Sequence, residues 1–128
     1  MDRIGQHVEV PAVPFAEMAG FGGVDPSLVV RAWVVKTLAL QTERFAEVPD
    51  VTCNAHMAMA QLRLHARPSS RMISLFQVAI DRLGIPARAY HGLLQVASTI
   101  ADLDGSDGIR SDHAAEAIQY RALDRRLV

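Results

Sequence analysis

The residues from Ile85 to Asp104, followed by Gly105, constrain the fold of this chain most strongly. A polar stripe and an apolar stripe alternate there at the three- and four-residue spacing of an amphipathic helix. Gly105 stands where a residue in the left-handed conformation usually ends a helix. The stretch therefore predicts a helix with one face in a core. The apolar stripe is Tyr90, Leu93, Leu94, Ala97, Ile100 and Ala101, and the polar one is Arg88, His91, Gln95, Ser98 and Asp102.

Helix and turn signals divide the rest of the chain. Gln6 to Val10 alternates enough to predict a short strand ended by Pro11, and a linker rich in proline and glycine follows to Val24. Asp25 as N-cap and Pro26 as first helical residue predict a helix to about Phe45. Later helices are expected at His56 to Leu64, from Ser69 through Leu83 with Gly84 closing it, and from Ser111 as cap, with Ala115, Ile118 and Ala122 inward.

The helix expected to end near Phe45 is apolar almost all round. A helix of that kind must be buried or must meet a partner. Two interpretations stay open: a surface for a partner, or sequence drift in a decaying gene copy. Its large apolar residues are Leu28, Val29, Val30, Trp33, Val34, Val35, Leu38 and Leu40.

Composition limits the function classes. With 128 residues, half of them hydrophobic and a net charge of −1, the chain is long enough for one core and gives no general reason to expect nucleic acid or membrane binding. Locally, residues 56–91 carry five arginines against one aspartate. A single cysteine, no signal-peptide pattern and no apolar run of about 18 residues favour the cytoplasm and no membrane partner.

The sequence contains no strong motif for catalysis or metal binding by this chain alone. The sequence contains no glycine-rich phosphate loop with lysine, and no acidic residue ending an apolar strand to hold Mg²⁺. Cys53, His56 and His65 are too irregularly spaced for a convincing metal site. His91, Ser98 and Asp102 share one helix face, whereas a catalytic triad converges from different elements. His113 is expected to be a solvated first-turn residue.

Several motifs together resemble one family. ARAY, VASTIADLDGSDGI and HAAEAIQYRALDR resemble the C-terminal helical domain of magnesium-chelatase-like AAA+ ATPases, closest to their competence-protein (ComM) branch. MDRIGQHVEVPAVPF resembles the strand that closes the ATPase core, and QTERF with CNAHM resembles the connection into the lid. The resemblance implies a mainly α chain with about four or five helices in an AAA+ lid-type bundle. Residues 1–24 would be a short strand and linker that end the ATPase core, and residues 25–55 a connecting helix and loop. Residues 56–128 would be the lid domain.

The resemblance also implies roles for two arginines. Arg3, in MDRI, matches an arginine-finger-like residue that acts in trans, because a guanidinium is permanently charged and suits γ-phosphate oxygens. Arg88, in ARAY, matches the sensor-2 arginine at the start of a lid helix, where the helix N-terminus also favours anions. Gly5 replaces the aspartate of the family motif. Other family cations are missing at Trp33, Leu38, His91, Gly92 and Ser98.

The leading hypothesis is a truncated member of this family, whose lid senses nucleotide and contacts ring subunits, linked by resemblance to DNA processing in natural transformation. It would not be an enzyme as an isolated chain. It would need no cofactor alone, and would use ATP and Mg²⁺ only with an intact AAA+ core. Two alternatives stay open: a free-standing helical module that binds DNA or a protein, and a non-functional gene remnant.

Overall fold

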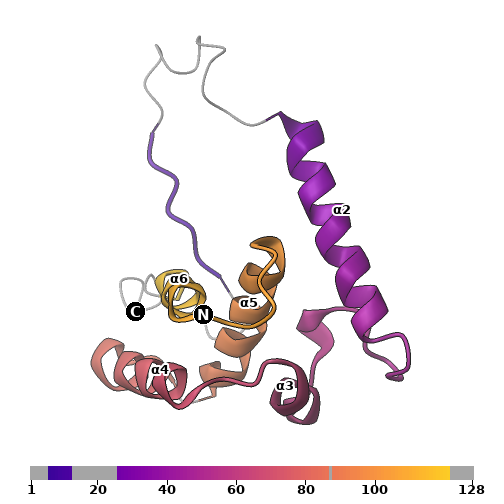
Figure 1. The fold of residues 1–128 in the computed structure, drawn as a ribbon. Coiled ribbons are helices and arrows are strands. Elements are labelled where there is room, and N and C mark those ends of the chain that lie inside the picture. The colour runs from indigo at the N-terminus through magenta and orange to yellow at the C-terminus, as the bar shows by residue number, and fades with distance from the viewer. Residues whose placement is uncertain (1–5, 13–25, 87, 122–128) are drawn as a thin grey trace.

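In a computed structural model, residues 6–12, 26–86 and 88–121 are described. All regular secondary structure in these ranges is helical, which confirms the predicted helical bundle (Figure 1). No described helix is long and apolar enough to cross a membrane. The elements are α2 (Ser27–Arg44), the 3₁₀ turn η1 (Asn54–His56), α3 (Met59–His65), α4 (Ser70–Leu83), α5 (Ala89–Leu103) and α6 (Ser111–Gln119).

The strand predicted at Gln6 to Val10 is not formed. Residues 6–12 have no regular secondary structure, and the backbone N–H of His7 donates to the carbonyl of Tyr120 at 2.7 Å. A strand needs a neighbouring strand for its backbone groups, and the described residues offer only helices. Most of the predicted linker, residues 13–24, lies outside the described residues, as does Asp25.

The amphipathic helix α5 is the central element of the bundle. It contacts α6, η1, α2 and α3, while α4 packs on α6 (Figure 1). Its predicted apolar face is confirmed, because Leu93, Leu94, Ala97 and Ala101 are all buried, and Tyr90 and Ile100 pack partly buried at the rim of the core. The other core side chains come from Phe45, Val51, Met57, Leu62, Ala66, Met72, Phe76, Ala114 and Ala117.

Glycines end the two long helices of the bundle as the sequence predicted. Gly84 (φ 66°) follows α4 and Gly105 (φ 69°) follows α5. After α5, the backbone N–H of Gly105 donates to the carbonyl of Asp102, and the N–H of Ser106 donates to the carbonyl of Ala101. These two bonds form a Schellman motif, which satisfies carbonyls that the helix end leaves open. At the start of α4, the hydroxyl of Ser69 accepts the N–H of Met72 at 3.2 Å, so the predicted cap is also present.

The last helix starts differently from the prediction. Arg110, not Ser111, is the N-cap residue, and its N–H donates to Nδ1 of His113 at 3.0 Å. His113 is only 2% exposed, so the expectation of a solvated residue was wrong. The inner face is Ala114 and Ala117 rather than Ala115, which is exposed. The predicted inward residue Ile118 is partly buried against the core, and Ala122 lies outside the described residues.

The polar stripe of α5, apart from the exposed Arg88, faces protein and not solvent. Asp102 is 7% exposed and lies against the end of α2, where Arg44 donates to both of its carboxylate oxygens at 2.6 and 3.0 Å. Gln41 and Asn54 donate to the same carboxylate at 3.1 and 2.7 Å. The side-chain oxygen of Asn54 also accepts from Arg44, and the backbone N–H of Asn54 donates to the side-chain oxygen of Gln41. We call Gln41, Arg44, Asn54 and Asp102 the polar clamp.

Beside the polar clamp, two further polar residues of α5 contact the chain around η1. The side-chain nitrogen of Gln95 donates to the carbonyls of Ala55 and Met57, and Nε2 of His91 lies 2.7 Å from the Met57 carbonyl. These contacts fix the irregular chain around η1 through its own backbone. A segment without regular structure can be held in a core only if its backbone groups find such partners.

Removing the carboxylate at the centre of the clamp should destabilise the bundle strongly. Asp102→Ala leaves Arg44 and Asn54 without their shared acceptor, and loss of one partner of a buried ion pair costs about 3 kcal/mol of unfolding free energy. Asp107→Ala, an exposed change in the following turn, should cost less than ~0.5 kcal/mol. Urea unfolding followed by circular dichroism compares the two variants. Equal stabilities would contradict a structural role for the clamp.

Candidate functional site

The N-terminal end of α5 carries Arg88, the nucleotide-sensing residue predicted from the sequence. Arg88 is the N-cap residue of the helix and its side chain is exposed, whereas its neighbours Ile85 and Ala89 are 4% and 7% exposed. The N–H of Ala89 donates to the carbonyl of Pro86 at 2.8 Å. Two buried anchors therefore hold the turn and direct Arg88 outward.

The electrostatics at this helix end favour an anion. The first turn of α5 contains no acidic residue, and no side chain caps its N–H groups. A helix N-terminus carries a partial positive charge, to which the guanidinium of Arg88 adds a full one. Arg3, the second predicted site residue, lies outside the described residues.

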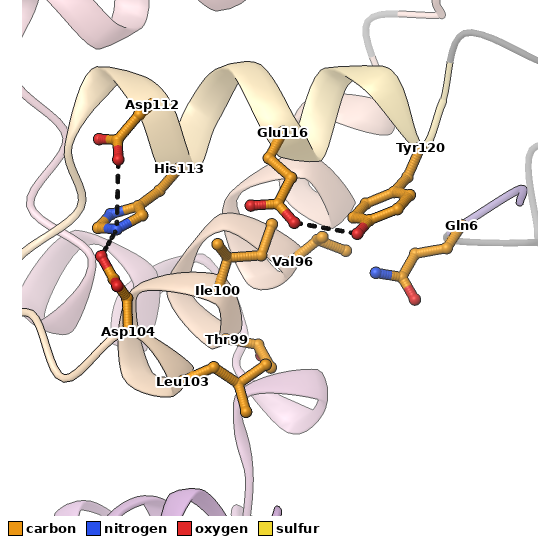
Figure 2. A pocket seen from close by; sticks show the side chains of 10 residues that line it. All are labelled: Gln6, Val96, Thr99, Ile100, Leu103, Asp104, Asp112, His113, Glu116 and Tyr120. Carbon is orange, nitrogen blue, oxygen red and sulfur yellow. Dashed lines mark hydrogen bonds and ion pairs between the residues drawn. The ribbon is translucent and has the colours of Figure 1, made fainter. Parts of the chain in front are cut away.

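A groove of about 390 Å³ lies between α5 and α6, on the side of the bundle reached by Gln6 (Figure 2). Three carboxylates, from Asp104, Asp112 and Glu116, line it together with His113 and Tyr120. The Tyr120 hydroxyl donates to Glu116 at 3.0 Å, and this carboxylate raises the pKa of the Tyr120 phenol. Of the three carboxylates, Asp104 and Asp112 are paired with Arg110, whereas Glu116 is not. Sequence reasoning missed the groove because its walls come from two helices and a distant segment.

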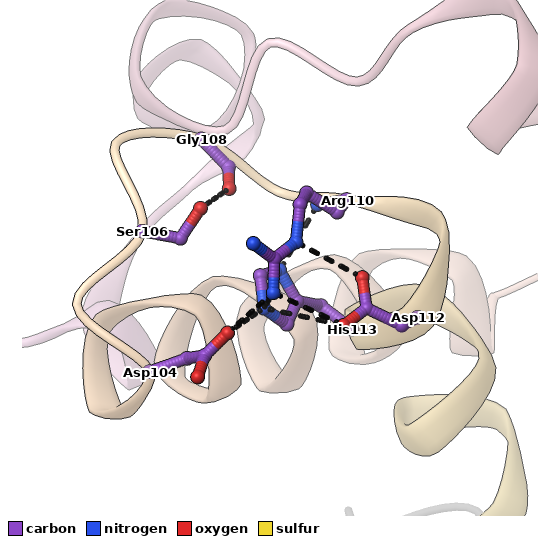
Figure 3. Close-up of polar contacts among 6 residues, drawn as sticks. All are labelled: Asp104, Ser106, Gly108, Arg110, Asp112 and His113. Atoms are coloured by element: carbon purple, nitrogen blue, oxygen red, sulfur yellow. Dashed lines mark hydrogen bonds and ion pairs between the residues drawn. The ribbon is translucent and has the colours of Figure 1, made fainter.

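The carboxylates at one end of the groove are held in an ion-pair cluster (Figure 3). Arg110 donates to Asp104 at 2.6 Å and to Asp112 at 3.1 Å, and Nε2 of His113 lies 2.8 Å from the same oxygen of Asp104. The hydrogen bond from Arg110 lowers the pKa of Asp112, and Asp112 in turn raises the pKa of Arg110. The cluster closes the turn between α5 and α6.

The same cluster contains the metal-type donors that the described ranges bring together. Oxygens of Asp104 and Asp112 and a nitrogen of His113 all lie within 4.8 Å of one another. The guanidinium of Arg110 bridges both carboxylates and offsets one of their two negative charges, which weakens the attraction for a cation. The other metal set considered from the sequence is not assembled: His56 contacts Thr52, while His65 packs edge-on against Phe45 with ring centroids 5.2 Å apart.

The polar stripe of α5 does not form a catalytic triad. His91 contacts the Met57 carbonyl, and Asp102 is occupied by the polar clamp. The hydroxyl of Ser98 is buried without a hydrogen-bond partner, and the space beside it, about 20 Å³ near Arg44 and His65, is the size of one water molecule. His91 and Asp102 therefore hold parts of the fold together, and the buried Ser98 hydroxyl is not presented to a substrate.

Comparison with known proteins places most of the chain in one family. Residues 24–121 match the family described as the C-terminal part of magnesium chelatase, subunit ChlI. The chain is 33% identical over 128 residues to the competence protein ComM of Haemophilus influenzae. This match covers 99% of this chain and 24% of that protein. It is 39% identical over 75 residues to the uncharacterized protein YifB of Escherichia coli, covering 59% of this chain and 15% of that protein. The chain thus spans about a quarter or less of the length of these relatives.

The imidazole of His65 should make the stability of the bundle depend on pH. Burial, and then the positive charges of Arg44 and Arg67, lower its pKa below the ordinary value of 6.5. Because the unfolded chain binds the proton more readily, this contribution to stability is present above about pH 6.5 and is lost as the pH falls below it. Thermal unfolding between pH 7.5 and 5.5 should show a smaller loss for His65→Gln than for the wild type. An unchanged pH dependence would rule out His65 as its source.

Proposed function

Because the chain belongs to the magnesium-chelatase C-terminal family, we propose that it acts as the lid of an AAA+ ATPase assembly and senses nucleotide through Arg88. The exposed position of Arg88 at the uncapped start of α5 carries this proposal. A γ-phosphate would meet the guanidinium and the positive helix end together. The remaining bundle would transmit the state of the nucleotide as a rigid body.

The rest of the nucleotide site would come from a partner. ATP and Mg²⁺ would bind only where an AAA+ core supplies the phosphate loop and the acidic metal ligands, in the cytoplasm. Arg3 would act as an arginine finger toward a neighbouring subunit of a ring. By the same resemblance, the assembly would take part in DNA processing during natural transformation, as the name of the competence protein suggests for that relative.

Nucleotide binding tests the role of Arg88. The chain alone should not raise the anisotropy of a fluorescent ATP analogue. Mixed with the ATPase core of a ComM-type relative that lacks its own C-terminal domain, it should increase binding, and Arg88→Ala should weaken that gain about tenfold, the loss of one charge-assisted phosphate contact. Arg71→Ala, an exposed arginine of α4, is the matched control and should change nothing.

Two outcomes would overturn this proposal. Tight Mg²⁺-dependent binding by the chain alone would mean that it holds a phosphate site of its own. Equal effects of Arg88→Ala and Arg71→Ala on the mixed sample would mean that Arg88 does not read the nucleotide.

A second candidate function is DNA binding by the free chain. All five arginines between residues 56 and 91 are exposed, and they belong to α3, α4 and the segments next to them. Exposed guanidinium groups on one run of chain can contact several phosphates. The arginines are Arg63, Arg67, Arg71, Arg82 and Arg88.

Salt dependence tests the DNA candidate. If three phosphates are contacted, the binding constant for duplex DNA should fall on the order of 40-fold between about 50 and 200 mM salt. The double variant Arg63→Ala with Arg71→Ala should reduce that slope, whereas Arg31→Ala on α2 should not. Fluorescence anisotropy with labelled duplex measures both effects. Absence of binding at low salt, or binding that ignores salt, would exclude this function.

A further inference from the structure

The hydroxyl of Ser98 lies buried on α5, and no atom of the described residues forms a hydrogen bond with it. Ser98 as a whole is 6% exposed. Burying a hydroxyl without a hydrogen bond costs free energy, so buried hydroxyls in native proteins almost always have a partner, either a protein group or an ordered water. Since the described protein atoms supply none, the chemistry of this position calls for a bound water.

The space beside Ser98 has the size and the lining that a water needs. Its volume is about 20 Å³, and it is bounded by Ser98 and Asp102 of α5, Arg44 of α2, His65 of α3 and the turn after α5. One water requires roughly 10–15 Å³ on this measure, together with two to four polar partners. A hydroxyl, a carboxylate, a guanidinium and an imidazole border the space, so the number of available partners is sufficient.

The carboxylate of Asp102 has room for one more hydrogen bond. Its Oδ2 accepts from Gln41, Arg44 and Asn54, whereas its Oδ1 accepts from Arg44 alone. A carboxylate oxygen can accept about two hydrogen bonds, which leaves one position open on Oδ1. Ser98 precedes Asp102 by four residues, and side chains at that spacing are neighbours on one helix face, with Cβ atoms about 5–6 Å apart.

We propose that one ordered water occupies this space and bridges the Ser98 hydroxyl to Oδ1 of Asp102. Two hydrogen bonds of about 2.8 Å span the separation of the two side chains. Arg44 offers a third contact, because three donations to Asn54 and Asp102 leave two of its five N–H groups for other acceptors. The water extends the polar clamp by one helical turn to Ser98, independently of any role of the chain in nucleotide sensing.

Urea unfolding of the full chain distinguishes a bridged hydroxyl from an unbonded one by the sign of the effect. Alanine is the better helix former, so Ser74→Ala, at an exposed position within α4, should raise the folding equilibrium constant about twofold. Ser98→Ala brings the same gain but loses the bridge, and should lower the constant about fivefold relative to Ser74→Ala, the effect of one hydrogen bond. If Ser98→Ala stabilises the chain as much as Ser74→Ala or more, the hydroxyl has no water partner and the proposal fails. Circular dichroism checks that both variants keep their helix content.

A high-resolution crystal structure of the chain tests the position of the water directly. It should show one water within about 3.2 Å of both the Ser98 hydroxyl and Oδ1 of Asp102. A serine within a helix can instead donate to the carbonyl four residues earlier, here that of Leu94. A Ser98 hydroxyl bonded to Leu94, or a water that reaches Ser98 without reaching Asp102, would overturn the bridge.

Discussion

The carboxylate of Asp102 holds the end of α2 and the turn η1 against α5. It accepts from Gln41 and Arg44 at the end of α2 and from Asn54 in η1, so one buried charge joins three segments. A buried carboxylate is costly to desolvate, and here Arg44 offsets that cost by a two-point contact. Because the buried residues within α2 are polar, its attachment depends on this contact together with the core side chain of Phe45, the residue that follows the helix.

Two kinds of interaction therefore stabilise different sides of α5: apolar packing on one and hydrogen bonds with an ion pair on the other. Around α4, α5 and α6 the interior is filled by aliphatic and aromatic side chains, among them Phe76, which meets Tyr90 edge-on at 5.8 Å. Such packing stabilises without specifying direction. At the other face of α5, hydrogen bonds of fixed geometry set the position of α2 and η1, and an error in any one of them leaves a buried polar group open.

Local signals in the sequence predicted the local structure. The apolar face of α5 follows from its period, the cap at Ser69 from its hydroxyl, and the left-handed turns from Gly84 and Gly105, because each depends only on residues a few positions away. The partners of the polar side chains on α5 could not be predicted in this way, because Arg44 and Asp102, which contact each other, are 58 residues apart in the sequence. His113 was misjudged for the same reason: its burial depends on Asp104 and on the packing of α6 against α5. Of the candidate site, the family resemblance located Arg88 at the start of its helix, whereas the acidic groove needed the fold.

Within the part of the chain that the structure describes, hydrogen bonds to the bundle hold α2 at its C-terminal end, so the helix can act as a lever. From Gln41 to Leu28 the helix rises about 20 Å, so a tilt of about 10° at the anchored end moves the free end by about 3 Å. A helix bends little over that length, so the displacement at Leu28 keeps nearly its full size. A small shift of Arg44 relative to Asp102 would therefore become a larger displacement at the N-terminal end of this 18-residue helix.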